Sequence, residues 1–288
     1  MPGSALVGRQ TSRSMTVIDM NGFAVNTYAY TFSHGVGDCI ETYAGTGAQG
    51  LEVMMYPGHA WPDDLDHGAR RALAKKSRDA GLPIISLNMP NIDINIAAAT
   101  PDMRAYSIDT LCRIIALAGD LEVPGVVVGP GKQNPLMPAP RDVLLGHFHK
   151  AMETLVPAAR AAGTRLLAEN MPFAFLPGAG EMMAALEPYA VEDVGVVYDI
   201  ANGHFCGEDL ADGFCAVAPR LALVHVSDTP TDVYLHAPVG QGTVPFAHGA
   251  EACRAVGYDG PTMMEIICDD PDREIPASAA ALSKLGWT

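Results

Sequence analysis

The chain has 288 residues, of which 49% are hydrophobic and 18% are charged, so it holds enough apolar material for a sizeable core. Its 33 acidic residues against 18 basic ones give a formal net charge of −15. This charge argues against partners such as the phosphate backbone of nucleic acids or an anionic membrane surface. The six cysteines are scattered without a CxxC pair, as is typical of reduced thiols in the cytoplasm.

The first 20 residues contain Arg9 and Arg13 among small polar residues and lack the apolar centre of a signal peptide. No apolar stretch in the sequence approaches the length of a transmembrane helix. We therefore expect a flexible N-terminal extension over residues 1–20, a single domain over residues 21–288, and a cytoplasmic location.

From residue 21 onward, short apolar runs alternate with amphipathic stretches. In residues 141–163, for example, Leu144, Phe148, Met152 and Leu155 recur at helical spacing. The apolar runs, which we predict to be buried strands, cover residues 22–30, 50–56, 82–88, 125–129, 165–170, 194–199, 221–227 and 262–267. Eight strands that alternate with helices predict a parallel sheet covered on its outer face. The fold we expect is therefore α/β, a (β/α)8 TIM barrel.

Each of the last four predicted strands carries an ionisable residue at or near its C-terminal end. These residues are Glu169, Asp199, His225 and Glu265. Carboxylates are rare at the end of a buried strand unless something compensates their charge, and in a TIM barrel such strand ends meet on one face. Three carboxylates and one imidazole form a mostly oxygen ligand set. The sequence therefore predicts one divalent metal ion, Mn²⁺ in the first place, with Mg²⁺, Co²⁺ or Zn²⁺ as alternatives.

Five short motifs accompany these positions: ENMP (169–172), YDIANGH (198–204), HVSDT (225–229), HAPVGQG (236–242) and MEI (264–266). In these motifs the chain resembles the xylose-isomerase-like superfamily of sugar isomerases and epimerases, including its ketose 3-epimerases. The resemblance implies that the four residues bind one metal ion and that Glu169 and Glu265 act as acid and base on opposite faces of the substrate. Two differences stand out: Asn202 occupies the place of a histidine of ketose 3-epimerases, and the segment 228–234 lacks their arginine.

The predicted reaction is proton transfer next to a carbonyl group. A divalent ion bound to an α-hydroxy ketone acidifies the shared C–H and stabilises the enediolate. Glu169 and Glu265 would exchange the proton, so that its return to the same carbon gives epimerisation and its return to the neighbouring carbon gives isomerisation. We therefore predict a metal-dependent isomerase or epimerase of a sugar or small polyhydroxy carbonyl compound. Loss of a β-hydroxyl would instead give a dehydratase or other lyase similar to inosose dehydratase, and the ligands alone do not separate the two.

Seven further residues are candidates for substrate contact. They are His59, Trp61, Asn88, Asn202, His204, Asp228 and His236. His236 precedes a Gly-x-Gly loop, where it either contacts a sugar hydroxyl or packs on the barrel rim. Asp228 either orients His225 or a hydroxyl, or forms a turn before Thr229 and Pro230. Lys132 leaves a phosphorylated or acidic sugar open as the substrate.

Two rival functions belong to other classes. An abasic-site nuclease of the same superfamily needs additional histidines, but strand 82–88 ends in Asn88 and strand 125–129 ends in Gly129. A non-catalytic sugar-binding barrel would not bind metal, although all four ligand positions are present. The resemblance thus implies a small, carbohydrate-like substrate, and it implies a homodimer or homotetramer because relatives often form them.

Overall fold

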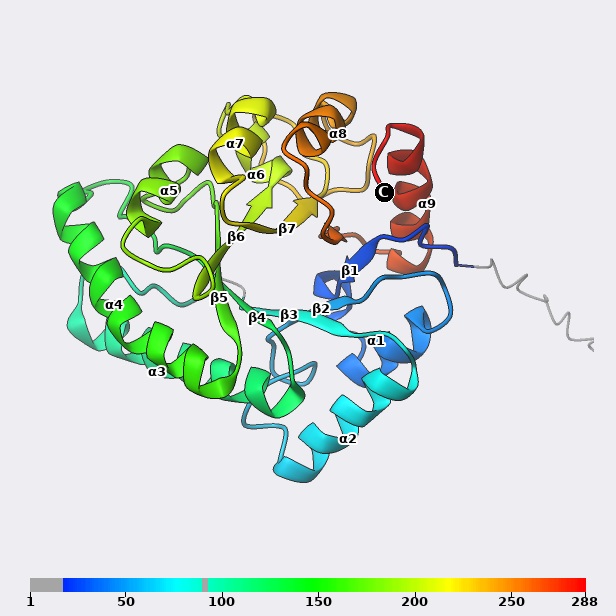
Figure 1. The fold of residues 1–288 in the computed structure, drawn as a ribbon, viewed down its shortest axis with the longest axis horizontal. Coiled ribbons are helices and arrows are strands. Elements are labelled where there is room, and N and C mark those ends of the chain that lie inside the picture. The colour runs from blue at the N-terminus through cyan, green and yellow to red at the C-terminus, as the bar shows by residue number, and fades with distance from the viewer. Residues whose placement is uncertain (1–17, 90–92) are drawn as a thin grey trace, which may run out of the picture.

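Eight parallel strands form a closed barrel in chain order in the computed structural model, which describes residues 18–89 and 93–288 (Figure 1). Most of the extension expected over residues 1–20 lies outside the described residues. The strands are β1 (Ala24–Asn26), β2 (Leu51–Met54), β3 (Ile84–Asn88), β4 (Gly125–Val128), β5 (Arg165–Glu169), β6 (Val194–Asp199), β7 (Leu221–Val226) and β8 (Thr262–Met264). Pairing of β1 with β8 closes the sheet, so this part of the chain has no free strand edge in the barrel.

Helices surround the barrel and alternate with its strands (Figure 1). They are α1 (Val36–Tyr43), α2 (His67–Asp79), α3 (Pro101–Leu121), α4 (Arg141–Ala162), α5 (Ala179–Leu186), α6 (Ile200–Phe205), α7 (Leu210–Val217), α8 (Phe246–Ala255) and α9 (Pro271–Lys284). This arrangement confirms the predicted (β/α)8 TIM barrel. Among the described residues, no helix has both the length and the hydropathy needed to cross a membrane.

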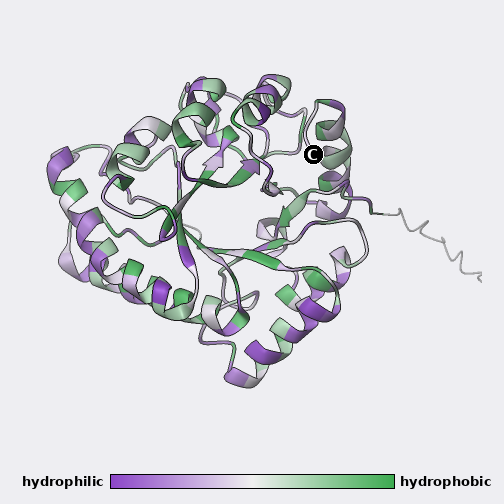
Figure 2. Ribbon diagram, viewed as in Figure 1, coloured by the Kyte–Doolittle hydropathy of each residue, from purple (hydrophilic) through white to green (hydrophobic). Residues whose placement is uncertain are grey.

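The core has two parts because alternate residues of each strand face opposite sides of the sheet. The larger part lies between the barrel and its helices, and Figure 2 shows outer helices such as α2 with hydrophilic residues on one side and hydrophobic residues on the other. A smaller apolar layer fills the barrel interior. It consists of Ala24, Val127, Leu167, Val197, Leu223 and Met263. The polar groups described below lie next to this inner layer.

The first strand is shorter than predicted. The sequence predicts a strand over residues 22–30, but β1 ends at Asn26 and a 3-10 helix follows over Tyr28–Tyr30. The side chain of Asn26 accepts a hydrogen bond from the backbone N–H of Tyr28 at 2.8 Å, which turns the chain out of the sheet. The last strand is also shorter, so that Glu265 follows β8 directly.

Candidate metal centre

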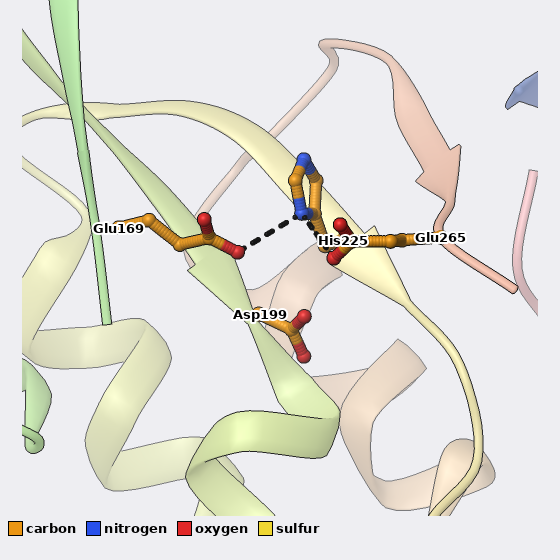
Figure 3. A group of neighbouring side chains, drawn as sticks. All are labelled: Glu169, Asp199, His225 and Glu265. Atoms are coloured by element: carbon orange, nitrogen blue, oxygen red, sulfur yellow. Dashed lines mark hydrogen bonds and ion pairs between the residues drawn. The ribbon is translucent and has the colours of Figure 1, made fainter. Parts of the chain in front are cut away.

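The four predicted ligands converge inside the C-terminal end of the barrel (Figure 3). One potential ligand atom from each of Glu169, Asp199, His225 and Glu265 lies within 4.8 Å of the others, and all four residues are buried. Nδ1 of His225 lies 3.1 Å from Oε2 of Glu265 and 3.2 Å from Oε1 of Glu169. Two glutamates that are far apart in the sequence thus lie beside the same imidazole nitrogen.

The strand periodicity explains this convergence. Each ligand follows a residue of the inner apolar layer by two positions, and residues two apart in a strand point to the same side. The pairs are Leu167 and Glu169, Val197 and Asp199, Leu223 and His225, and Met263 and Glu265. The apolar layer therefore forms a floor below the centre, and the ligands point into the same space above it.

The residues present fit a divalent cation. Oδ1 of Asp199 accepts a hydrogen bond from the backbone N–H of Asn202 at 2.9 Å, whereas the buried Oδ2 has no hydrogen-bond partner among the described residues. A buried carboxylate oxygen without a partner is costly unless a cation compensates it. A set of three carboxylates and one imidazole suits the hard divalent metals, and such an ion would supply the compensation.

Burial and mutual repulsion perturb the ionisation of these groups. Burial raises the pKa of Asp199 to about 6. It also raises the pKa of Glu169, an effect that His225 opposes and that the neighbouring Asp199 and Glu52 increase. Burial alone would lower the pKa of His225, but Glu52, Glu265 and Glu169 around the ring outweigh it and raise that pKa well above its usual value. The cluster therefore attracts positive charge.

A cavity of about 600 Å³ opens above this centre, and Glu169 and Glu265 form part of its wall. Its size lies within the range typical of small-molecule sites. Three of the seven candidate contact residues also line it, namely Asn88, Asn202 and His236. Lys132, which the sequence suggested for an anionic substrate group, lines it as well, and burial lowers the pKa of this lysine.

Tyr234 is a cavity residue that the sequence did not single out. Its hydroxyl donates a hydrogen bond to Oδ1 of Asn202 at 2.7 Å and lies 2.7 Å from Nε2 of His236. The other ring nitrogen of His236 lies 3.0 Å from Oγ of Ser227. Burial raises the pKa of Tyr234, so the phenol keeps its proton as a donor. Tyr234 belongs to the segment 228–234, for which the sequence indicated Asp228 and a missing arginine but not this tyrosine.

The other four candidate contact residues are not among the described residues that line the cavity. His59 contacts Oγ1 of Thr27 at 2.9 Å and the carbonyl of His34 at 2.6 Å, and these contacts engage both ring nitrogens. Trp61 packs on the outer core. These two residues therefore pack around the loops that follow β1 and β2.

Asp228 and His204 lie around the loop that follows β7. Asp228 accepts hydrogen bonds from the backbone N–H groups of Gly240 at 2.8 Å and Val244 at 3.1 Å. Nε2 of His204 lies 2.9 Å from Oγ1 of Thr243. Both side chains thus hold the loop that presents His236, and neither orients His225, the alternative considered for Asp228.

Gly242 should be intolerant of a side chain. A Cβ at this position would lie 2.4 Å from Oδ1 of Asp228 and 2.5 Å from the backbone of Thr229. We expect Gly242→Ala to lower the free energy of unfolding by about 1–3 kcal/mol, as overpacking does. Gly146→Ala is the control, because Gly146 is exposed in α4 and no described atom lies within 4 Å of the added Cβ. This change should leave stability equal or raise it by about 0.5–1 kcal/mol. Urea unfolding measures both, and equal stability of the two variants would contradict the contact.

Solved structures of sugar epimerases share this fold. A D-tagatose 3-epimerase-like protein is 19% identical, with a TM-score of 0.78 over 92% of this chain and 96% of that chain. D-psicose 3-epimerase from Clostridium cellulolyticum H10 is 14% identical, with a TM-score of 0.74 over 91% of this chain and 97% of that one. The 3-keto-D-glucoside 4-epimerase from E. coli is 19% identical, with a TM-score of 0.70 over 91% and 99%.

The sequence also matches a family directly. No curated protein gives a significant match to the chain. The family described as xylose isomerase-like TIM barrel, however, matches residues 40–285, which include the four clustered residues and most of the barrel. The chain therefore belongs to the xylose isomerase-like TIM barrel family.

Proposed function

We propose that the protein is a divalent-metal-dependent isomerase or epimerase of a sugar or small polyhydroxy carbonyl compound. The observation that carries this proposal is the position of Glu169 and Glu265, which come from β5 and from the residue after β8 and line one cavity beside the same imidazole. The solved epimerases with this fold support the choice of reaction class.

Glu169, Asp199, His225 and Glu265 would hold the metal ion. We propose Mn²⁺ first, because three carboxylates and one imidazole suit it, with Mg²⁺, Co²⁺ or Zn²⁺ as alternatives. When bound, the ion would supply a Lewis acid that withdraws electron density from a substrate carbonyl.

The two glutamates are the groups that move the proton. A carboxylate needs a pKa near the working pH to take up and return a proton efficiently, and burial raises the pKa of Glu169 in that direction. Since the glutamates reach the cavity from β5 and from the end of β8, they can act on a bound substrate from two sides. One removes the proton from the carbon next to the carbonyl, and the other delivers a proton to the opposite face.

Further polar groups line the cavity and would orient the substrate. Tyr234, Asn202 and His236 form a hydrogen-bonded group beside the glutamates. A substrate hydroxyl can replace one of these internal bonds, because each group offers a donor or an acceptor. Such an arrangement suits uncharged hydroxyls, which agrees with a polyhydroxy substrate.

The test uses metal-reconstituted protein incubated with ketoses, inososes and small hydroxy-carbonyl acids in D₂O. We expect deuterium at a carbon next to the carbonyl, with the product otherwise equal in composition to the substrate. NMR and mass spectrometry measure the position and the mass. A product lighter by one water would assign the protein to the dehydratases instead, and turnover without bound metal would contradict the metal dependence.

A further inference from the structure

Glu52 is a fully buried carboxylate in β2, outside the four-residue cluster. Its Oε2 accepts a hydrogen bond from Oγ of Ser86 at 2.6 Å. Its Oε1 accepts hydrogen bonds from Nδ2 of Asn26 at 2.6 Å and from Nδ2 of Asn88 at 3.0 Å. Strands β1 and β3 therefore surround this carboxylate with neutral donors, an arrangement that stabilises its charged form.

The fourth neighbour of Glu52 is the imidazole of the candidate metal centre. Nε2 of His225 lies 3.1 Å from Oε1 of Glu52, across the barrel interior. This is an ion-pair distance, and Nε2 makes no hydrogen bond with the described residues in this ring orientation.

The two nitrogens of His225 thus face different partners. Nδ1 points to Glu169 and Glu265 in the cluster, and Nε2 points to Glu52. A histidine that ligates a metal through one nitrogen commonly donates the other N–H to a carboxylate, which fixes the tautomer and the ring orientation. Glu52 is placed to accept that bond.

The same carboxylate is linked to a second candidate ligand. Nδ2 of Asn26, which donates to Glu52, also lies 3.3 Å from Oε1 of Glu265. Glu52 is therefore next to His225 directly and is linked to Glu265 through Asn26. In other strands apolar residues fill the barrel interior. Packing alone therefore does not require a carboxylate at this position.

We propose that Glu52 is a positioning residue, which holds the Nε2–H tautomer of His225 and thereby raises the affinity of the centre for its divalent metal. This inference rests on the metal dependence proposed above. Glu52 itself is not a ligand, because its oxygens face Asn26, Ser86, Asn88 and Nε2 of His225.

The test compares Glu52→Gln with Ser86→Ala by calorimetric titration of the metal-free full chain with Mn²⁺. Loss of an outer partner of a metal-ligating histidine typically costs about 10–100-fold in metal affinity, and we expect that loss for Glu52→Gln. Ser86→Ala is the matched control, since it removes a bond to the oxygen that does not face His225. We expect a distinctly smaller loss for it. Equal affinity of Glu52→Gln and the unsubstituted protein would overturn the proposal.

A second comparison asks whether the effect passes through the imidazole. In a His225→Gln background, the further change Glu52→Gln should alter Mn²⁺ affinity much less than it does alone. An undiminished effect there would show that Glu52 acts through the general field of the barrel, and would overturn the positioning role. If the unsubstituted protein binds no divalent metal, it is the proposed function that fails.

A third measurement needs no substitution at Glu52 and holds if Glu52→Gln does not fold. In the protein loaded with diamagnetic Zn²⁺, ¹⁵N NMR of labelled histidines should show His225 protonated at Nε2, with the signal assigned by its loss in His225→Gln. Circular dichroism of the metal-free variants checks that they are folded. Protonation of His225 at Nδ1 in the loaded protein would contradict the proposal.

Discussion

Glu265→Gln should lower kcat by roughly 10²–10⁴-fold, the usual contribution of a positioned acid–base group. Glutamine is nearly isosteric, so the shape of the cavity wall is preserved, although it keeps only one of the two oxygens, of which Oε2 lies beside Nδ1 of His225 and Oε1 accepts from Asn26. It cannot, however, accept or return a proton at neutral pH. The loss should appear in kcat because the group acts on the reacting carbon, and steady-state kinetics with the substrate identified in D₂O measure it.

Glu169→Gln should lower kcat by a similar factor. It should, however, abolish deuterium exchange from one epimer, and Glu265→Gln should abolish it from the other. If the two glutamates act on opposite faces, each serves one epimer as the base. The variant that lacks one base should still exchange the proton of the epimer served by the other, without converting it. Deuterium uptake into each pure epimer, followed by NMR, reads this directly.

Glu251→Gln serves as the control for both substitutions, because Glu251 is an exposed residue of α8. It should leave kcat and deuterium uptake unchanged. If Glu169→Gln and Glu265→Gln both retained full conversion of the substrate, the assignment of the two glutamates would be wrong. If both lost exchange from the same epimer only, a single glutamate would be the base and the two-sided mechanism would fail.

The barrel and the convergence of the four ionisable residues could be predicted because both follow from strand periodicity. The apolar runs mark the strands, and parallel strands that close in chain order bring their C-terminal ends to one face. An ionisable residue at the end of such a run, for example Asp199, then has to lie near its counterparts on the neighbouring strands. No side-chain contact had to be known for this inference.

The contacts above the barrel could not be predicted in the same way. Loop residues have no fixed periodicity, so the sequence indicated His59 as a candidate contact residue and did not indicate Tyr234. His59 bonds to Thr27 and to a backbone carbonyl, whereas Tyr234 reaches the cavity wall and contacts Asn202. Which of two loop residues faces the substrate depends on turns such as the one pinned by Asp228.

Glu52 shows a different limit of the sequence pattern. A glutamate inside an apolar run is the same signal that marks the four candidate ligands, but Glu52 is the second residue of its strand and not the last. Being earlier in the strand, it meets Nε2 of His225 while Nδ1 faces the cluster. Its partners Asn26, Ser86 and Asn88 could have marked it, because polar residues in neighbouring buried strands need one another.

Asp199→Asn should weaken divalent metal binding by more than the roughly 10–100-fold that loss of an outer partner costs, because it removes a charged ligand. The fold should be retained. Asp199 caps α6 by accepting the N–H of Asn202, and the side-chain carbonyl of asparagine can accept the same bond. Calorimetric titration with Mn²⁺ measures the loss, and Asp212→Asn on the exposed side of α7 is the control.

The same carboxylate should make metal binding depend on pH. Burial raises the pKa of Asp199 to about 6 in the metal-free protein, and the metal binds only its ionised form. Below pH 6 protons therefore compete with the cation for Asp199. This group alone should lower the metal affinity by up to about tenfold per pH unit below pH 6, and its contribution should disappear above pH 6. His225 adds competition at higher pH, since its pKa is raised well above the usual value.

Metal protection against unfolding should follow the same curve. A cation at a hundredfold excess over its Kd stabilises the folded chain by about 3 kcal/mol, and this gain should shrink as the pH falls through 6. In Asp199→Asn the metal affinity should be lower throughout, and its dependence on pH should lose the component contributed by this carboxylate. An Asp199→Asn variant with the affinity and the pH profile of the unsubstituted protein would remove Asp199 from the ligand set and leave the centre with two carboxylates and one imidazole.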